Sequence, residues 1–268
     1  MKIRSRGIAE LDAFGERPDA RSLSALWDGE IAAVRVRNLV SVEVCQQLTS
    51  RLLASQMIED HADVKGLRVL GLSHFQAARD AELAHRYHDE ARTSSGFLRA
   101  LASPQASPFD SAMAFLAQMW PFGCQLMELP TEGLSTPFTI RIYGEGVDIE
   151  PHQDILSAES PKDPFAKQLT RQFGANIYIS MGQRGGTLDL FDTDYAETTY
   201  TDLAYGPRVV SRDSLGEPVR ITPMVGELIL LSSHRIHAVA APEDNVARIT
   251  ISFFVGLRDD QSPCLVWA

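Results

Sequence analysis

The second half of the chain is a succession of short apolar runs, and this feature limits its fold more than any other. From Pro137 onward, runs rich in Ile, Leu, Thr, Tyr and Phe are separated by glycine and proline. β-Branched and aromatic residues favour strands, and glycine and proline mark the turns between them. Several short strands in one stretch favour a sandwich, a jelly roll or a barrel. The strands that we expect are residues 138–143, 175–180, 187–191, 227–231 and 247–255.

The first 132 residues have a different pattern, which indicates helices. Residues 41–53 place Val44 and Leu48 at helical spacing behind Ser41, a residue type that caps helix N-termini. We also expect helices at 77–87 and 109–120. The chain therefore predicts an α+β fold with a mainly β core, in which helices pack on the outside of the strands.

The sequence contains no clear boundary between domains. No linker rich in proline or serine divides the halves, so residues 1–268 are expected to form one domain. In that domain, residues 1–132 would be mainly helical support and residues 133–258 the β core. Two polar segments, 157–173 and 192–218, have the pattern of insertions, and the second is long enough to form a lid.

Charge and cysteine content narrow the partners and the compartment. A formal net charge of −10 repels phosphate backbones, so nucleic acid is not expected as a partner. Three scattered cysteines form no disulfide framework and indicate free thiols in a reducing cytoplasm. No apolar run reaches the ~18–20 residues of a membrane span, and the charged N-terminus is unlike a secretory signal. We expect a cytoplasmic protein without a membrane partner, and a homodimer stays open.

A histidine and an aspartate two residues apart suggest a metal site. On a strand, His152 and Asp154 would point to the same face, so that an imidazole and a carboxylate converge. With one more histidine they form a facial triad, which leaves three positions open on an octahedral iron(II). A bidentate 2-oxo acid would fill two positions and dioxygen the third. A surface turn or a core histidine explains the pair alone equally well.

The end of the chain supplies the third ligand and an anion site. His237 lies 11 positions before Arg248, which opens the alternating run Arg-Ile-Thr-Ile-Ser-Phe. Arg248, Thr250 and Ser252 share one face of this strand, and the other face is apolar. A buried arginine needs an anionic partner, and guanidinium binds carboxylate in a planar, two-pronged way. The distal carboxylate of 2-oxoglutarate fits, and Thr250 could add a hydroxyl hydrogen bond.

Over residues 137–258 the chain resembles the Fe(II)- and 2-oxoglutarate-dependent oxygenases of the prolyl-hydroxylase-like group. As a whole it is also similar to small free-standing bacterial members, such as an N-succinyl amino-acid hydroxylase and the indole-alkaloid halogenases. The resemblance implies a double-stranded β-helix (a cupin-like jelly roll) with flanking N-terminal helices. The segments that carry it occur in the family's order: Arg141-Ile-Tyr-Gly-x-Gly, His152-x-Asp, Asn176-Ile-Tyr-Ile-Ser, Gly185-Gly-Thr-Leu-Asp-Leu, Gly226-Glu-Leu, His237-Ala-Val and Arg248-x-Thr.

The same resemblance implies an activity and its cofactors. His152, Asp154 and His237 would hold Fe(II), with 2-oxoglutarate and dioxygen as co-substrates. The enzyme would hydroxylate an unactivated C–H bond of a small soluble molecule, an amino acid or an amino-acid derivative. Tyr143 and Tyr178 would reach 2-oxoglutarate, although packing in a barrel explains these aromatic residues equally well.

Three further residues are candidates for the cavity. Arg141 shares a strand face with Tyr143, so it would line the same cavity unless it forms a surface ion pair. His74 and, more weakly, Arg79 match a segment beside the substrate in the small-molecule members. His234 stands three positions before His237 and is the alternative ligand, but the His-x-Val pattern favours His237.

Other functions are also compatible with some of these motifs. In the halogenases that the chain resembles, the carboxylate ligand is missing and halide binds in its place. Because this chain has Asp154 at that position, the resemblance implies hydroxylation or desaturation. A nucleic-acid demethylase conflicts with the negative charge. The substrate could instead be a nucleotide or a natural-product scaffold. A noncatalytic, cupin-like metal-binding protein is also conceivable, but it would not need Arg248 on the inner face.

Overall fold

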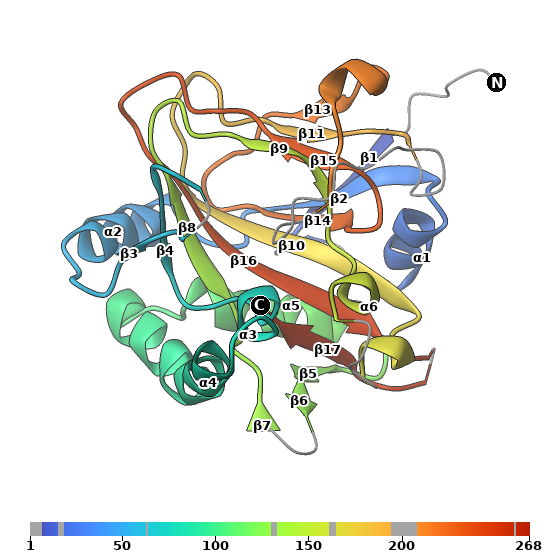
Figure 1. Cartoon of the computed structure of the whole chain (residues 1–268), viewed down its shortest axis with the longest axis horizontal. Helices are drawn as coiled ribbons and strands as arrows, with labels where there is room; N and C mark the ends of the chain where they lie inside the picture. The colour runs from blue at the N-terminus through green and yellow to red at the C-terminus, as the bar shows by residue number, and fades with distance from the viewer. Residues whose placement is uncertain are drawn as a thin grey trace.

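The computed structural model describes residues 7–15, 19–62, 64–129, 133–160, 165–193, 208–259 and 261–268. In this part of the chain two β-sheets face each other, and helices cover the outer face of the larger sheet (Figure 1). The expected mainly β jelly-roll core with flanking helices is thereby confirmed. No helix among these residues is both long enough and apolar enough to span a bilayer.

The larger sheet contains the longest strands and draws on the whole length of the chain. Eight strands lie side by side, and two more extend the sheet from β16. In spatial order they are β1 (Gly7–Asp12), β2 (Ile31–Arg37), β14 (Leu228–Ser232), β10 (Arg171–Ser180), β16 (Arg248–Leu257), β8 (Thr139–Tyr143), β4 (Leu67–Leu70) and β3 (Glu59–Asp60), with β17 (Cys264–Trp267) on β16 and β5 (Cys124–Leu126) on β17.

The smaller sheet closes over the inner face of the larger one. Its order is β12 (Arg208–Val209), β9 (Ile149–Gln153), β15 (His237–Val239), β11 (Leu188–Leu190) and β13 (Val219–Ile221). A separate hairpin pairs β6 (Glu128–Leu129) with β7 (Gly133–Leu134). The expected strands correspond to β8, β10, β11, β14 and β16, whereas the short β9 and β15 lacked a pattern long enough to detect.

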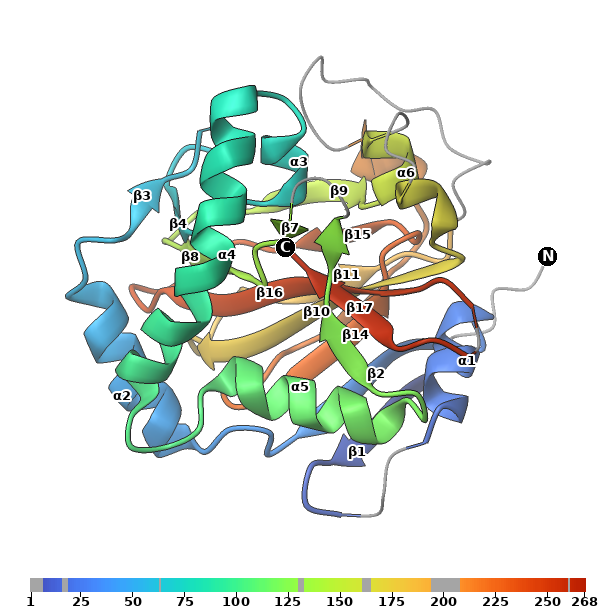
Figure 2. The same cartoon turned by 90° about the horizontal axis from the view of Figure 1, so that it is seen from below.

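Helices cover the outer face of the larger sheet, as the view from below shows (Figure 2). Ser41 caps α2 by accepting a hydrogen bond from the Val44 N–H at 3.3 Å, as the sequence predicted. Asp80 caps α4, which begins at Ala81, and the short helix α3 ends at Ala77. The helix expected at 77–87 therefore covers the end of one helix and the start of another. The helices are α1 (Arg21–Trp27), α2 (Val42–Leu53), α3 (His74–Ala77), α4 (Ala81–Ala102), α5 (Pro108–Met119) and α6 (Leu156–Glu159), with 3₁₀ turns η1 (Ala166–Gln168) and η3 (Arg212–Ser214).

Two apolar layers hold this arrangement together. Alternate residues of β16, such as Ile249 and Ile251, point outward into a cluster shared with α1, α2, α4 and α5. An inner cluster between the sheets includes Leu188, Tyr143 and Tyr178. The outer cluster contains residues from both halves of the chain, and the single domain stays a prediction from the sequence.

The N-terminal half adds strands that the sequence pattern did not reveal. Ala32, Ala33 and Val34 of β2 are all buried, so this strand lacks the alternation that marks a half-exposed strand. The strand β2 pairs with β14 and thereby joins the central sheet. The expected lid at 192–218 falls partly outside the described residues; beyond this gap, β12 pairs with β9.

A buried ion pair ties β2 to the turn before β14. Arg35 Nε donates to Glu227 Oε2 at 2.6 Å, and the two side chains are only 11% and 2% exposed. Glu227 also accepts the Met224 N–H at 2.7 Å. A second pair on the same strand, Arg37 with Glu10, is 42% and 50% exposed and provides a natural control.

We predict that Arg35→Ala lowers the free energy of unfolding by ~3 kcal/mol or more, because Glu227 is left buried without its cation. Arg37→Ala should lower the free energy of unfolding far less, because its ion pair is exposed to solvent. Equilibrium urea unfolding followed by tryptophan fluorescence measures both values. Equal losses for the two variants would contradict the importance of the buried pair.

Candidate metal centre and adjoining cavities

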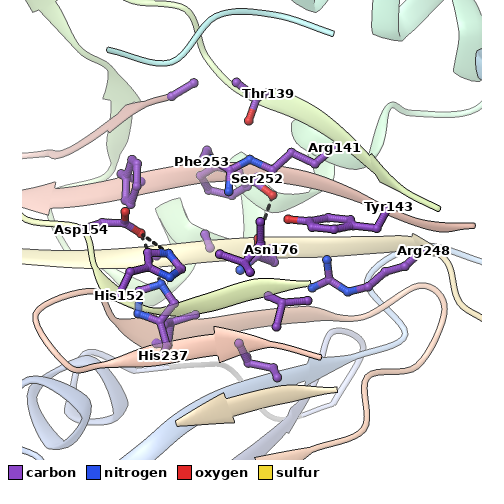
Figure 3. A pocket seen from close by; sticks show the side chains of 18 residues that line it. Thr139, Arg141, Tyr143, His152, Asp154, Asn176, His237, Arg248, Ser252 and Phe253 are labelled. Carbon is purple, nitrogen blue, oxygen red and sulfur yellow. Dashed lines mark hydrogen bonds and ion pairs between the residues drawn. The ribbon is translucent and has the colours of Figure 1, made fainter. Parts of the chain in front are cut away.

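Three potential metal ligands meet between the two sheets. His152 on β9 and His237 on β15 are Cα partners on neighbouring strands, and Asp154 follows directly after β9. Their ligand atoms all lie within 4.8 Å of one another. The Asp154 Oδ2 is 3.2 Å from His237 Nε2 and 3.7 Å from His152 Nε2 (Figure 3). The structure therefore brings together the three residues that the sequence grouped.

Hydrogen bonds to the backbone orient both imidazoles. The Nδ1 of His152 lies 2.8 Å from the Glu150 carbonyl, and the Nδ1 of His237 lies 2.9 Å from the Arg235 carbonyl. Because a carbonyl only accepts, each Nδ1 carries the proton and each Nε2 presents a lone pair to the other ligands. This is the tautomer that a metal ion requires.

The charge state also suits a metal ion. Burial, together with the nearby His237, lowers the pKa of His152 to about 4, so His152 is neutral at physiological pH. Burial by itself would raise the pKa of Asp154, but the adjacent His152 and His237 outweigh it and hold that pKa well below the usual range. A neutral imidazole and an ionised carboxylate are the metal-binding forms of these side chains.

The backbone of Asp154 is held by a glutamine that sequence reasoning missed. The Gln172 side chain, which is buried, donates to the Asp154 carbonyl at 3.1 Å and accepts the Leu156 N–H at 3.0 Å. The Asp154 N–H donates to the Ser233 carbonyl at 3.0 Å. Gln172 lies two, four and six positions before Gly174, Asn176 and Tyr178 on β10, so the alternation of that strand was the available signal.

Arg248 is a buried cation without an anionic partner among the described residues. Its guanidinium carbon lies 4.5 Å from the ring centre of Tyr143 and 5.1 Å from that of Tyr178. Its Nη2 reaches the Tyr178 hydroxyl at 3.5 Å, but Nε and Nη1 have no hydrogen-bond partner in this part of the chain. A charge that is only 2% exposed and incompletely satisfied is costly unless an anion binds it.

A short polar row continues along the inner face of the larger sheet. The Thr250 and Ser252 hydroxyls are 3.1 Å apart, and Ser252 donates to Asn176 Oδ1 at 2.7 Å. The hydroxyl of Thr250, which the sequence assigned to a ligand, is thus hydrogen-bonded within the protein. Asn176 and Ser252 line a cavity that also contains Arg248 and His152, and the sequence did not predict this role for them.

Two cavities meet at His152 and Asp154, and His237 lines only one of them. An inner cavity of about 40 Å³ extends to Arg248, and a larger one of about 130 Å³ extends to α3. Figure 3 shows Arg248 and the His152–Asp154–His237 cluster at opposite ends of the inner one. The two cavities share His152, Asp154 and Arg141. The inner cavity is therefore bounded by potential metal ligands at one end and a cation at the other.

The other predicted residues separate into two groups. His74 is buried and lines the larger cavity, whereas Arg79 is exposed, stacks 5.4 Å above the Phe75 ring and lines neither cavity. His234 packs edge-on against Trp27, with ring centres 5.1 Å apart, and lies outside the ligand cluster.

The residues present fit an iron(II) ion with 2-oxoglutarate. Two imidazoles and one carboxylate form a donor set typical of non-haem iron(II) oxygenases. The partnerless Nε and Nη1 of Arg248 suit the distal carboxylate of 2-oxoglutarate. The described part of the chain contains no other cluster of potential metal ligands.

Comparisons with known proteins agree with this fit. The family of the carrier-protein-independent halogenase WelO5 matches residues 9–268. An N-substituted L-amino acid dioxygenase from Burkholderia ambifaria AMMD has a similar structure, with a TM-score of 0.60 and 16% identity, covering 93% of this chain and 91% of that one. Its complex with α-ketoglutarate gives a TM-score of 0.59 with the same identity and coverage.

A prolyl-4-hydroxylase from Pseudomonas putida is more distant, with a TM-score of 0.41 and 15% identity, covering 88% of this chain and 99% of that one. No curated protein matches the chain in sequence. At such low identities the structural similarity establishes the fold alone. The family match extends over nearly the whole chain and sets aside the noncatalytic alternative. The chain therefore belongs to the family of the carrier-protein-independent halogenase WelO5 and is an iron(II)- and 2-oxoglutarate-dependent oxygenase.

Proposed function

We propose that this oxygenase hydroxylates an unactivated C–H bond of a small molecule, with iron(II) held by His152, Asp154 and His237. One observation carries the proposal: the ligand cluster retains a carboxylate, with Asp154 Oδ2 only 3.2 Å from His237 Nε2. When bound, iron(II) with 2-oxoglutarate and dioxygen supplies the oxidising power for C–H cleavage. The protein contributes geometry, charge and the exclusion of water.

Each residue around the inner cavity has a defined task in this proposal. His152 and His237 direct their Nε2 atoms at the metal position, because their Nδ1 atoms are hydrogen-bonded to backbone carbonyls. Arg248 anchors the distal carboxylate of 2-oxoglutarate, and the rings of Tyr143 and Tyr178 cover its guanidinium. A charge pair shielded from water in this way is stronger than one in solvent.

The substrate that we favour is an amino acid or an amino-acid derivative. The similar structure from Burkholderia ambifaria is an N-substituted L-amino acid dioxygenase, which motivates this choice. The net charge of −10 argues against nucleic acid. A cytoplasmic location remains a prediction from the sequence, as does a homodimer.

Halogenation is the second candidate, because the matching family is named for a halogenase. A halide would need a metal position that no protein ligand takes. Here Asp154 lies where a third ligand would bind and brings a negative charge that repels a second anion. This argument places hydroxylation ahead of halogenation for this chain.

We predict that His237→Ala abolishes both iron(II) binding and succinate formation from 2-oxoglutarate, because one of three ligands is lost. His234→Ala should keep the iron and most of the activity, since His234 packs against Trp27 outside the cluster. Iron content and succinate yield, measured on both purified variants, test the assignment. If His234→Ala loses the metal and His237→Ala keeps it, the choice of histidine is wrong.

Arg248→Ala should raise the apparent constant for 2-oxoglutarate by roughly two orders of magnitude or more. The reason is that losing one partner of a buried charged pair costs ~3–5 kcal/mol, and ~1.4 kcal/mol is tenfold. Iron affinity should change little. The shift in this constant is measured by titrating each protein with 2-oxoglutarate, both in a calorimeter and in assays of the initial rate.

The Arg248→Ala variant without 2-oxoglutarate supplies a control for folding. Arg248 has no anionic partner among the described residues, so its loss leaves no buried charge behind. Arg248→Ala should therefore unfold at the same or a higher temperature than the unaltered protein when 2-oxoglutarate is absent. An unchanged 2-oxoglutarate constant would show that Arg248 is structural.

We predict that the unaltered enzyme, incubated with iron(II), 2-oxoglutarate, substrate and saturating chloride, gives a hydroxylated and not a chlorinated main product. Asp154→Gly should bind iron more weakly and lose most hydroxylation, because it has one ligand fewer. Mass spectrometry of the products and metal analysis measure these effects. A chlorinated main product from the unaltered enzyme would refute both the hydroxylase proposal and the assignment of Asp154 as a ligand.

A further inference from the structure

The larger cavity is where a substrate would reach the metal centre. It adjoins His152 and Asp154 and has a volume of about 130 Å³. Most of its wall is apolar, including Leu156 after β9, Phe254 on β16 and Trp267 on β17. The rings of Phe254 and Trp267 pack with centres 5.7 Å apart and form one continuous apolar surface. Such a wall suits a hydrocarbon or aromatic side chain.

Arg141 is the cation of this cavity. It is the only arginine or lysine among the described residues that line it, and Asp154 is the only acidic side chain among them. The Arg141 guanidinium makes no hydrogen bond or ion pair with any described residue, and its side chain is partly buried. Arg141 lines both cavities together with His152 and Asp154, so it lies on the side of the metal centre.

The strand register separates Arg141 from Arg248. On β16, Arg248 is level with Tyr143 of β8, whereas Arg141 is level with Thr250, one inward-facing position further along. Tyr143 covers the Arg248 guanidinium, which lines only the inner cavity. Arg141 lines both cavities. The two arginines can therefore bind two different anions.

We propose that Arg141 binds the carboxylate of the substrate, and that the larger cavity selects small carboxylic acids with an apolar side chain. Asp154 is the only acidic side chain among the described residues of the cavity, and it belongs to the metal centre. No acidic side chain of the cavity pairs with Arg141, so we assign its anion to the substrate, because Arg248 holds the distal carboxylate of 2-oxoglutarate. The apolar wall of Leu156, Phe254 and Trp267 then receives the side chain. The assignment of Arg248 rests on the proposed function, but binding of an acid at Arg141 does not require turnover.

Isothermal titration calorimetry with matched acids and amides tests this inference. The probes are N-acetyl-L-leucine and N-acetyl-L-phenylalanine, each against its primary amide. They are titrated into metal-free protein and, without oxygen, into protein loaded with iron(II) and 2-oxoglutarate. The unaltered protein should bind at least one acid about tenfold or more tightly than its amide, which is the lower end of a charge-assisted hydrogen bond. If neither acid is preferred in either form of the protein, the proposal is overturned.

Two variants locate the effect. Arg141→Gln should abolish the preference for acid over amide while leaving the constant for 2-oxoglutarate within a few fold. Arg68→Gln, which alters an exposed arginine on neighbouring β4, should keep the preference. If Arg141→Gln weakens 2-oxoglutarate and not the acid, Arg141 serves the co-substrate and the inference is wrong. Thermal unfolding confirms that each variant is folded.

The acid-binding test of Arg141 and the tests of the proposed function can fail independently. Failure of the iron and succinate measurements would refute the oxygenase chemistry assigned to these residues. The acid preference of metal-free protein would stand or fall by itself.

Discussion

The register of β16 against its two neighbours determines which of its side chains face the interior between the sheets. This strand is buried on both faces, with Ile249 and Ile251 against the helices and Arg248 and Thr250 facing the smaller sheet. A slip by one residue would place an arginine in the apolar layer and isoleucines in the cavity. The helices that cover the outer face therefore fix the polar interior as well, because they bury one face of the strand.

Inside this frame, the protein places unlike charges at fixed positions along one cavity. The carboxylate of Asp154 lies at the end with the two imidazoles, and Arg248 lies at the other end between two tyrosine rings. Neither group is neutralised by an ordinary ion pair with a cation or an acid of the described chain. Part of the folding free energy is thus used to keep groups ready for ligands. A protein selected for stability alone would pair these charges or replace them by apolar residues.

The sequence revealed the parts of the site that depend on short spacing. His152 on β9 and Asp154 just after it lie two residues apart, and Arg248 opens a long alternating strand, so both patterns are local. Gln172 could have been found by the same alternation but was assigned to an insertion. The wall formed by Phe254 and Trp267 depends on the pairing of β16 with β17, and no local pattern encodes that pairing. The strand β2 was missed because it is buried on both faces.

The ligand cluster is supported by two independent sets of contacts. Each histidine bonds to a carbonyl two residues earlier in the chain, whereas the backbone of Asp154 is held by Gln172 and Ser233. A change of side chain at position 154 would leave the support of both imidazoles untouched. Evolution can therefore vary the third ligand by a single codon while keeping the rest of the centre. A scaffold divided in this way allows related enzymes to diverge in reaction type before they diverge in fold.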